Sequence, residues 1–224
     1  MKLPVLFYVY LYSSAIPIIA GFLRIQRLNR GAKIFYVLTV VGLMFTLAEI
    51  YLAKQHMHNL WLVHLYRLIW LPAVAYMLSL WTGQEISKVV LRWVMITYVA
   101  FWCVAKLTLE PLTGGWDAYT STTSNILLIS FSVYFLTFSN WKQGDNLPNA
   151  YYVVILSGIL LLSIGDLFLF AMGDKFITLT KLEGVNIYRI HWAVNSIANV
   201  MFAYGFWSLR DPECQPVTAR ETIE

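Results

Sequence analysis

Seven long apolar stretches, separated by short polar connectors, occupy almost the whole chain. A helix needs about 20 apolar residues to cross the hydrocarbon core of a bilayer, and each stretch reaches roughly that length. The pattern predicts an all-α polytopic membrane protein whose transmembrane helices lie at Pro4–Phe22, Ile34–Ala53, Leu60–Trp81, Val89–Leu109, Tyr119–Ser139, Tyr151–Met172 and Ile187–Leu209. Residues 1–209 then form a single seven-helix bundle.

The stretches fit helices better than strands, because a run such as ILSGILLLSIGDLFLFAM is apolar on every face apart from isolated polar points, whereas barrel strands alternate. The first stretch is longer than the apolar part of a secretory signal, so we expect it to remain in the mature protein. Proline removes a backbone donor and clashes one turn back, so Pro17 and Pro72 predict kinks. Gly158 and Gly165 predict close approach of two helices.

Composition and charge agree with a membrane protein, since 59% of the residues are hydrophobic and 12% are charged. Lys and Arg in short loops resist translocation. With seven spans, one side carries Arg24, Arg27, Arg30, Lys33, Lys88, Arg92, Lys142, Arg210 and Arg220, and the other carries Lys2, Lys54, Lys175, Lys181 and Arg189. This bias predicts an outer N-terminus and a short disordered cytoplasmic tail at residues 210–224. The net charge of +4 then reflects loops facing anionic lipid and requires no nucleic acid.

Polar residues inside the predicted spans carry the clues to function, because a charged side chain near the bilayer centre is costly. They are Glu49, His64, Arg67, Lys106, Asp166, His191, Asn195 and Asn199. The predicted direction of each span places most of them in the outer half of the membrane. Tyr188, His191, Asn195 and Asn199 follow one another at steps of three and four, which aligns them on one helix face.

This polar layer predicts an outward-facing ligand-binding pocket formed by Glu49, His64, Arg67, Asp166, His191 and Asn195. In it, Arg67 anchors an anionic group and the two carboxylates balance its charge, while Trp61, Tyr66 and Trp192 close the walls. The competing interpretation is a structural polar network that fixes helix register. A metal site is disfavoured because no metal-binding spacing of histidines occurs, and the sequence identifies neither a cofactor nor a catalytic motif.

A resemblance supports the importance of three of the spans. The segments HNLWLVHLYRLIW, TSNILLISFSVYFL, ILSGILLLSIGDLFLFAM and IHWAVNSIANVMFAYGFW resemble, in this order, an uncharacterised family of seven-helix membrane proteins common in Bacteroidetes-type bacteria. Asn59, His64 and Tyr66 fill that family's pattern in the third span. The pattern of the last span is shifted here, and Asp166 replaces a frequent asparagine. The resemblance implies a bacterial inner-membrane location and supplies no activity.

These features favour a receptor-like or sensory subunit that signals through a membrane or cytoplasmic protein partner, because the chain has no catalytic motif and no internal repeat. Two alternatives stay open. One is an intramembrane lipid-modifying enzyme in which Asp166 or Glu49 acts as acid or base with His191. The other is an accessory or structural subunit of a larger membrane complex. Membrane lipids are expected neighbours in every case.

Overall fold

The fold is helical throughout the part of the chain that the structure describes. The structure is a computed structural model that describes residues 4–82, 84–112, 117–138, 150–171 and 181–209. These residues form eight α-helices and no strand. The predicted tail at residues 210–224 lies outside the described residues. The all-α prediction is therefore confirmed for the described chain.

The first predicted span consists of two short helices, α1 (Val5–Ser13) and α2 (Ala15–Leu23). The interruption lies at Ser14, three residues before Pro17. Proline cannot donate to the carbonyl one turn earlier, and its ring clashes with that carbonyl, so the interruption lies where Pro17 predicts it. Pro72 behaves differently, because helix α4 (Leu60–Trp81) runs through it without an interruption.

The remaining helices follow the predicted spans with shifted ends. They are α3 (Arg30–Lys54), α5 (Glu85–Thr108), α6 (Tyr119–Thr137), α7 (Ala150–Ala171) and α8 (Lys181–Trp207). Helix α3 begins before the predicted residue Ile34 because Asn29 caps it, and the Asn29 side chain accepts a hydrogen bond from the Ala32 amide at 2.8 Å. Such a cap satisfies a backbone donor that has no partner within the helix. A hydropathy pattern does not detect the polar residues at the start of a capped helix, so it places the start too late.

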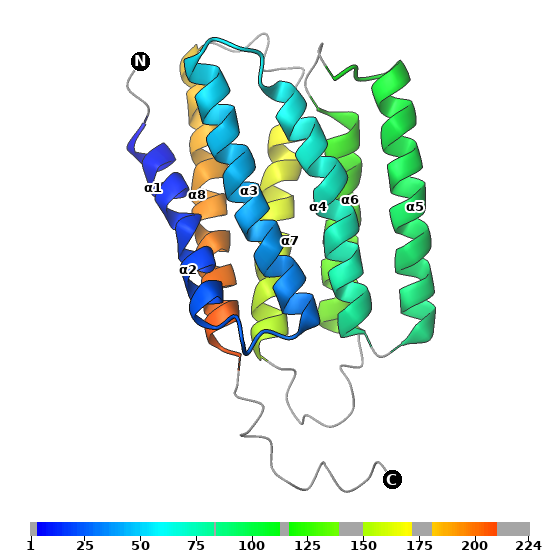
Figure 1. Cartoon of the computed structure of the whole chain (residues 1–224). Helices are drawn as coiled ribbons and strands as arrows, with labels where there is room; N and C mark the ends of the chain where they lie inside the picture. Colours follow the sequence, from blue (N-terminus) through cyan, green and yellow to red (C-terminus); the bar gives the residue numbers. More distant parts are fainter. Residues whose placement is uncertain (1–3, 83, 113–116, 139–149, 172–180, 210–224) are drawn as a thin grey trace, which may run out of the picture.

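The helices pack as a bundle in which α7 contacts both α6 and α8, α3 contacts α4, and α2 contacts α8. Helix α5 lies at one edge beside α4 and α6 (Figure 1). Two glycines on α7 allow the close approach of α8. A Cβ atom on Gly158 would lie 2.5 Å from the Phe202 ring, and one on Gly165 would lie 2.7 Å from the Val194 side chain. The predicted role of these glycines is confirmed.

Five stretches of the described chain are long and apolar enough to cross a membrane: Val5–Leu23, Arg30–Lys54, Leu60–Trp81, Glu85–Thr108 and Tyr151–Phe170. Large apolar side chains are exposed on their outer faces, including Leu107 at 86% and Ile86 at 80%. Exposed apolar surface of this extent suits contact with lipid. These helices indicate a protein embedded in a membrane.

A cluster of aromatic side chains forms the core between α3, α4 and α8. The Phe35 ring lies 4.8 Å from the ring of Phe202 and 6.1 Å from that of Trp70, and both neighbours are almost completely buried. Trp70 and Phe202 also line a cavity that extends towards the end of the bundle where α3 ends and α4 begins. The apolar core therefore borders the candidate site.

Candidate functional site

A cavity of about 420 Å³ lies among helices α1, α3, α4, α7 and α8. Its wall includes every residue that the sequence assigns to a ligand-binding pocket, namely Glu49, His64, Arg67, Asp166, His191 and Asn195. These residues come from four helices and are separated by up to 146 positions in the chain. The structure thus brings all six together around one space.

Three of the six form a continuous chain of charged contacts across the bundle. An Nη2 atom of Arg67 on α4 lies 2.5 Å from Oδ2 of Asp166 on α7, and Nδ1 of His191 on α8 lies 3.1 Å from Oδ1 of the same carboxylate. Asp166 is 4% exposed and Arg67 is 6% exposed. A buried carboxylate needs partners of this kind, because unpaired charge in an apolar interior is costly. Asp166 therefore links three helices.

The Arg67 guanidinium is held on several sides. Its Nη1 donates to Oδ1 of Asn125 on α6 at 3.4 Å, and its central carbon lies 4.9 Å from the centre of the Phe170 ring. Its Nε is buried and has no hydrogen-bond acceptor among the described residues. Both terminal nitrogens are thus engaged by the protein itself, so Arg67 presents little free charge to the cavity.

Glu49 differs from the other charged residues of the cavity. It lies near the end of α3 and lines the cavity, yet its carboxylate makes no hydrogen bond or ion pair with any described residue. Its charge interacts with Arg67 and His191 across the cavity. The sequence predicts that both carboxylates balance Arg67, but only Asp166 contacts it directly.

The polar face of α8 lines the cavity as the spacing predicts, with Tyr188, His191, Asn195 and Asn199 all in its wall. The Asn195 amide donates to the His191 carbonyl at 2.8 Å, and the Asn199 amide donates to the Ser13 hydroxyl at 3.1 Å. The second bond ties α8 to the end of α1. This face therefore connects the cavity with the interrupted first span.

The predicted aromatic walls need correction. Tyr66 lines the cavity, but Trp61 and Trp192 do not. Trp61 lies in the first turn of α4 and is partly exposed, with its indole N–H bonded to the His58 carbonyl at 3.1 Å. Trp192 packs instead against Phe7, with ring centres 5.5 Å apart. The lining aromatic residues are Tyr10, Phe45, Tyr66, Trp70, Phe170, Tyr188 and Phe202.

A second buried polar cluster adjoins the cavity and is centred on Lys106 of α5. Its Nζ lies 2.6 Å from Nδ1 of His64, 2.7 Å from a Glu110 oxygen and 3.0 Å from an Asp117 oxygen. The Thr120 hydroxyl accepts a bond from the same ammonium at 2.8 Å. All of these residues are buried. His64 and Asp117 also line the cavity, so the two polar groups meet there.

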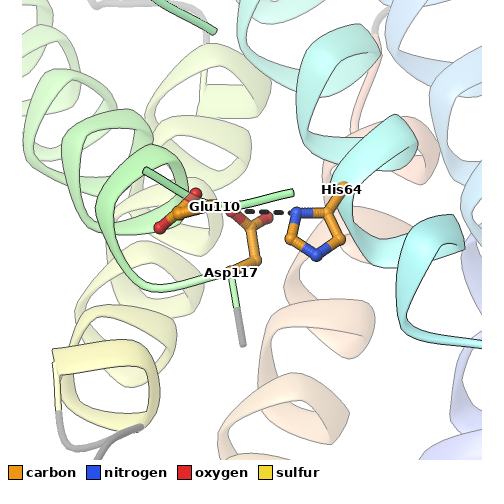
Figure 2. A group of neighbouring side chains, drawn as sticks. All are labelled: His64, Glu110 and Asp117. Carbon is orange, nitrogen blue, oxygen red and sulfur yellow. Dashed lines mark ion pairs between the residues drawn. The ribbon is translucent and has the colours of Figure 1, made fainter. Parts of the chain in front are cut away.

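Three residues of this cluster have the donor types of a metal site. Figure 2 shows that His64 projects from α4 towards the two carboxylates, with Asp117 facing its ring. One possible ligand atom from each of His64, Glu110 and Asp117 lies within 4.8 Å of the others. The Lys106 ammonium, however, contacts all three residues. The protein's own cation thus occupies the position that a metal ion would need.

Asp117 lies in the connector between α5 and α6, where burial alone would raise the pKa of its carboxyl group. Hydrogen bonds with His64 and Thr120 and the charge of Lys106 outweigh burial and hold that pKa well below its usual range. The Ser121 hydroxyl also donates to this carboxylate at 2.8 Å. Asp117 is therefore a fixed negative charge beside the cavity.

Glu110, Asp117 and Thr120 are the site residues that the sequence analysis missed, because the two acids fall in a predicted connector. Two local patterns point to them. Glu110 follows Lys106 by four positions, the spacing of an ion pair on one helix face. Both acids also precede the start of α6, where a carboxylate is favoured, and Glu110 accepts hydrogen bonds from the backbone amides of Tyr119 and Thr120.

Chemically, the cavity offers a histidine in contact with a buried carboxylate, a second carboxylate that has no partner among the described residues, and a wall that includes seven aromatic side chains. It provides both apolar surface and a few convergent polar groups, which is the usual make-up of a small-molecule site. The family resemblance of the sequence stays a prediction. Comparisons of the chain with family models, with curated proteins and with solved structures yield no match.

Proposed function

We propose that this protein is a multi-pass inner-membrane protein of a bacterium and acts as a receptor-like sensory subunit. In this proposal seven spans cross the membrane, with α1 and α2 forming the first, the N-terminus outside and the C-terminus in the cytoplasm. The cavity then opens towards the outside and binds a small ligand. A partner protein receives the signal, because the described chain consists almost entirely of bundle helices.

The observation that carries this proposal is the convergence of Glu49, Arg67, Asp166 and His191 on a cavity of about 420 Å³. Small-molecule sites commonly have volumes of about 300–1,000 Å³. A network that served only to fix helix register would pack its polar groups against one another, as the cluster around Lys106 does. An open space beside polar groups from α3, α4, α7 and α8 favours ligand binding.

Signalling would proceed by a shift between two packings of the helices. The cavity wall includes residues of the interrupted first span, Tyr10 and Ser14, as well as the polar face of α8. A ligand that contacts both elements more favourably in one packing than in the other stabilises that packing. The Asn199–Ser13 hydrogen bond joins these same elements and is a contact that such a shift would change.

The test is purification in mild detergent followed by native mass spectrometry and absorption spectroscopy. We expect a bound species in stoichiometric amount with the wild-type protein and its loss in Glu49→Ala and His191→Ala, since both residues line the cavity. Glu85→Ala and His58→Ala serve as matched controls, since both residues are exposed and lie outside the cavity. An empty wild-type preparation would overturn the proposal.

A second candidate function, an intramembrane lipid-modifying enzyme, is favoured by the Asp166–His191 contact of 3.1 Å. A carboxylate that orients a histidine is the arrangement of a general base, and Arg67 holds that carboxylate in place. The histidine would accept a proton from water or from a lipid hydroxyl in the cavity. An enzyme of this kind would convert a lipid into a product, whereas a receptor would bind its ligand without converting it.

Turnover separates the two functions. The protein is reconstituted in nanodiscs and incubated with a mixture of phospholipids and lysophospholipids, and products are followed by mass spectrometry. An enzyme would show products that disappear in Asp166→Asn and His191→Ala while the fold is retained. Binding without products would leave the receptor-like function as the better account.

A further inference from the structure

We propose that the cavity binds a small organic cation, an ammonium group carried by an organic molecule, with Glu49 as its counter-ion. This inference rests on the proposed ligand-binding function and specifies the chemical class of the ligand. It reverses the charge that the sequence suggests, since a pocket containing an arginine is first expected to hold an anion. Four features of the described residues carry it.

The first feature is the state of Arg67. Its Nη2 lies 2.5 Å from Asp166, its Nη1 donates to Asn125, and its Nε is buried without a hydrogen-bond acceptor among the described residues. An anionic ligand would have to displace Asp166 and leave that carboxylate without its partner. Removing one partner from a buried ion pair is strongly unfavourable. Arg67 is therefore already neutralised by the protein.

The second feature is Glu49, whose carboxylate lines the cavity and has no hydrogen bond or ion pair within the described structure. The charges that act on it are those of Arg67 and His191, and both of these side chains contact Asp166. A carboxylate at a cavity wall without a cation of its own is a site that a ligand cation can complete. The ammonium of the ligand would supply the missing charge.

The third feature is the total charge of the buried polar groups. The cavity and the adjoining cluster contain two permanent cations, Arg67 and Lys106, and four carboxylates, those of Glu49, Glu110, Asp117 and Asp166. The carboxylates therefore outnumber the permanent cations by two. A region of low dielectric constant favours charge balance, so it attracts a cation more strongly than an anion.

The fourth feature is the set of tyrosines that share the cavity wall with Glu49. Tyr10, Tyr66 and Tyr188 each lie close enough to interact electrostatically with its carboxylate, and all three line the cavity. Aromatic faces attract cations through the ring quadrupole, and cages of aromatic residues bind quaternary ammonium groups. The cavity wall thus combines the Glu49 carboxylate with the residue types that such sites use.

These features favour an organic ammonium over a metal ion. A divalent metal needs several oxygen or nitrogen ligands in direct contact, and Glu49 does not belong to the metal-type cluster found among the described residues. The cavity is also larger than an ion requires, because about 420 Å³ accommodates the organic part of a ligand as well. Both a free amino alcohol and a zwitterionic lipid headgroup carry such an ammonium group, and either could bind in the cavity.

The test compares probes of the same shape and different charge on the full-length protein in nanodiscs. Choline and tetramethylammonium are the cations, 3,3-dimethylbutan-1-ol is the neutral counterpart of choline, and 3,3-dimethylbutanoate is the anion. Affinity is measured by the change in tryptophan fluorescence, since Trp70 lines the cavity. We expect choline to bind at least about tenfold more tightly than the neutral counterpart, and the anion to bind more weakly still.

Glu49→Gln tests the assigned counter-ion, because it removes the charge and keeps the size of the side chain. We expect choline affinity to fall at least tenfold in this variant while the affinity for the neutral probe is unchanged. Glu85→Gln is the matched control, since Glu85 lies at the exposed start of α5 and pairs there with Lys88. An affinity for choline that is the same in both variants would overturn the role of Glu49.

The outcomes distinguish this inference from the function on which it rests. Binding of the neutral or anionic probe as tightly as choline would leave a ligand-binding cavity and overturn the cation class. Absence of binding by all four probes would overturn the cation class as well, and an empty purified protein would in addition overturn the proposed function. Glycerophosphocholine, used as a further probe, identifies the source: tighter binding than choline indicates a lipid headgroup, and weaker binding indicates a free cation.

Discussion

At the scale of single residues, the pair formed by Arg67 and Asp166 has the largest expected effect on stability. We expect Asp166→Asn to lower the free energy of unfolding by about 3–5 kcal/mol, because the Arg67 guanidinium stays buried without its counter-charge. The measurement is thermal and denaturant unfolding in detergent. The exposed pair Lys88–Glu85 provides the control, since removing it by Glu85→Gln should change stability by less than about 1 kcal/mol.

A double variant makes this prediction sharper. Replacing both partners by apolar residues, as in Arg67→Met with Asp166→Leu, removes the charges together, and such replacements are often neutral for stability. We expect the double variant to be more stable than Asp166→Asn alone. If it is instead less stable than the single variant, the ion pair itself, and not the uncompensated charge, accounts for the loss.

Lys106 gives a second prediction at this scale. Lys106→Met leaves the carboxylates of Glu110 and Asp117 buried without their cation, so the variant should unfold at a lower temperature than the wild type. His64, Glu110 and Asp117 can then bind Zn²⁺, since their donor atoms lie within 4.8 Å of one another and these residue types suit that ion. We expect Zn²⁺ to raise the melting temperature of Lys106→Met and to leave that of the wild type unchanged.

Adding His64→Ala to Lys106→Met should abolish the effect of Zn²⁺, because one of the three ligands is then missing. A melting temperature of Lys106→Met that does not respond to Zn²⁺ would contradict the view that Lys106 occupies a cation position. If Zn²⁺ raises the melting temperature of the double variant as much as that of Lys106→Met, the metal binds elsewhere in the protein.

At the scale of helices, the close contact of α7 with α8 governs how Gly158 responds to substitution. In a free helix, alanine is more favourable than glycine by up to about 1 kcal/mol. Here a Cβ atom would lie 2.5 Å from the Phe202 ring, so we expect Gly158→Ala to destabilise the protein by about 1–3 kcal/mol. Ile164→Ala on the exposed face of the same helix is the control. A stabilising Gly158→Ala would show that the helices can separate at little cost.

The helices themselves are the part of the fold that the sequence predicts well. Long apolar runs are long because the bilayer sets their length, and the interruption before Pro17 follows from the missing backbone donor. The ends are less accurate, because caps such as Asn29 extend α3 beyond its apolar part. Hydropathy measures how apolar a segment is, and it contains no information on the hydrogen bonds that cap the end of a helix.

The sequence predicts residues that line the candidate site, but it does not predict which of them contact one another. The cost of a buried charge singles out Glu49, Arg67 and Asp166 in the sequence, and the structure places all three around one cavity. Which carboxylate contacts Arg67 depends on how α4 packs beside α7, and hydropathy does not contain that information. Glu110 and Asp117 are not predicted either, because they are buried by the folding of a connector, and a hydropathy pattern detects only segments that the membrane would bury.

At the scale of the whole molecule, the polar groups are segregated towards one end of the bundle. The cavity residues Glu49 and His64 lie near the end where α3 meets α4, and this end is opposite the side where α2 leads into α3 (Figure 1). Arg24, Arg27 and Arg30 lie on that opposite side. In the proposed orientation these basic loops lie in the cytoplasm, and a ligand then reaches the cavity from outside.

Cysteine labelling in intact cells tests this orientation. In a Cys103→Ala, Cys214→Ser background, His58→Cys introduces a thiol into the exposed α3–α4 connector, and Glu85→Cys introduces one at the exposed start of α5. We expect a membrane-impermeant maleimide to label His58→Cys in intact spheroplasts and to label Glu85→Cys only after the membrane is opened. The reverse pattern would turn the cavity towards the cytoplasm. The cation would then have to be an intracellular ligand, because Glu49 and its tyrosines would be reached from that side alone.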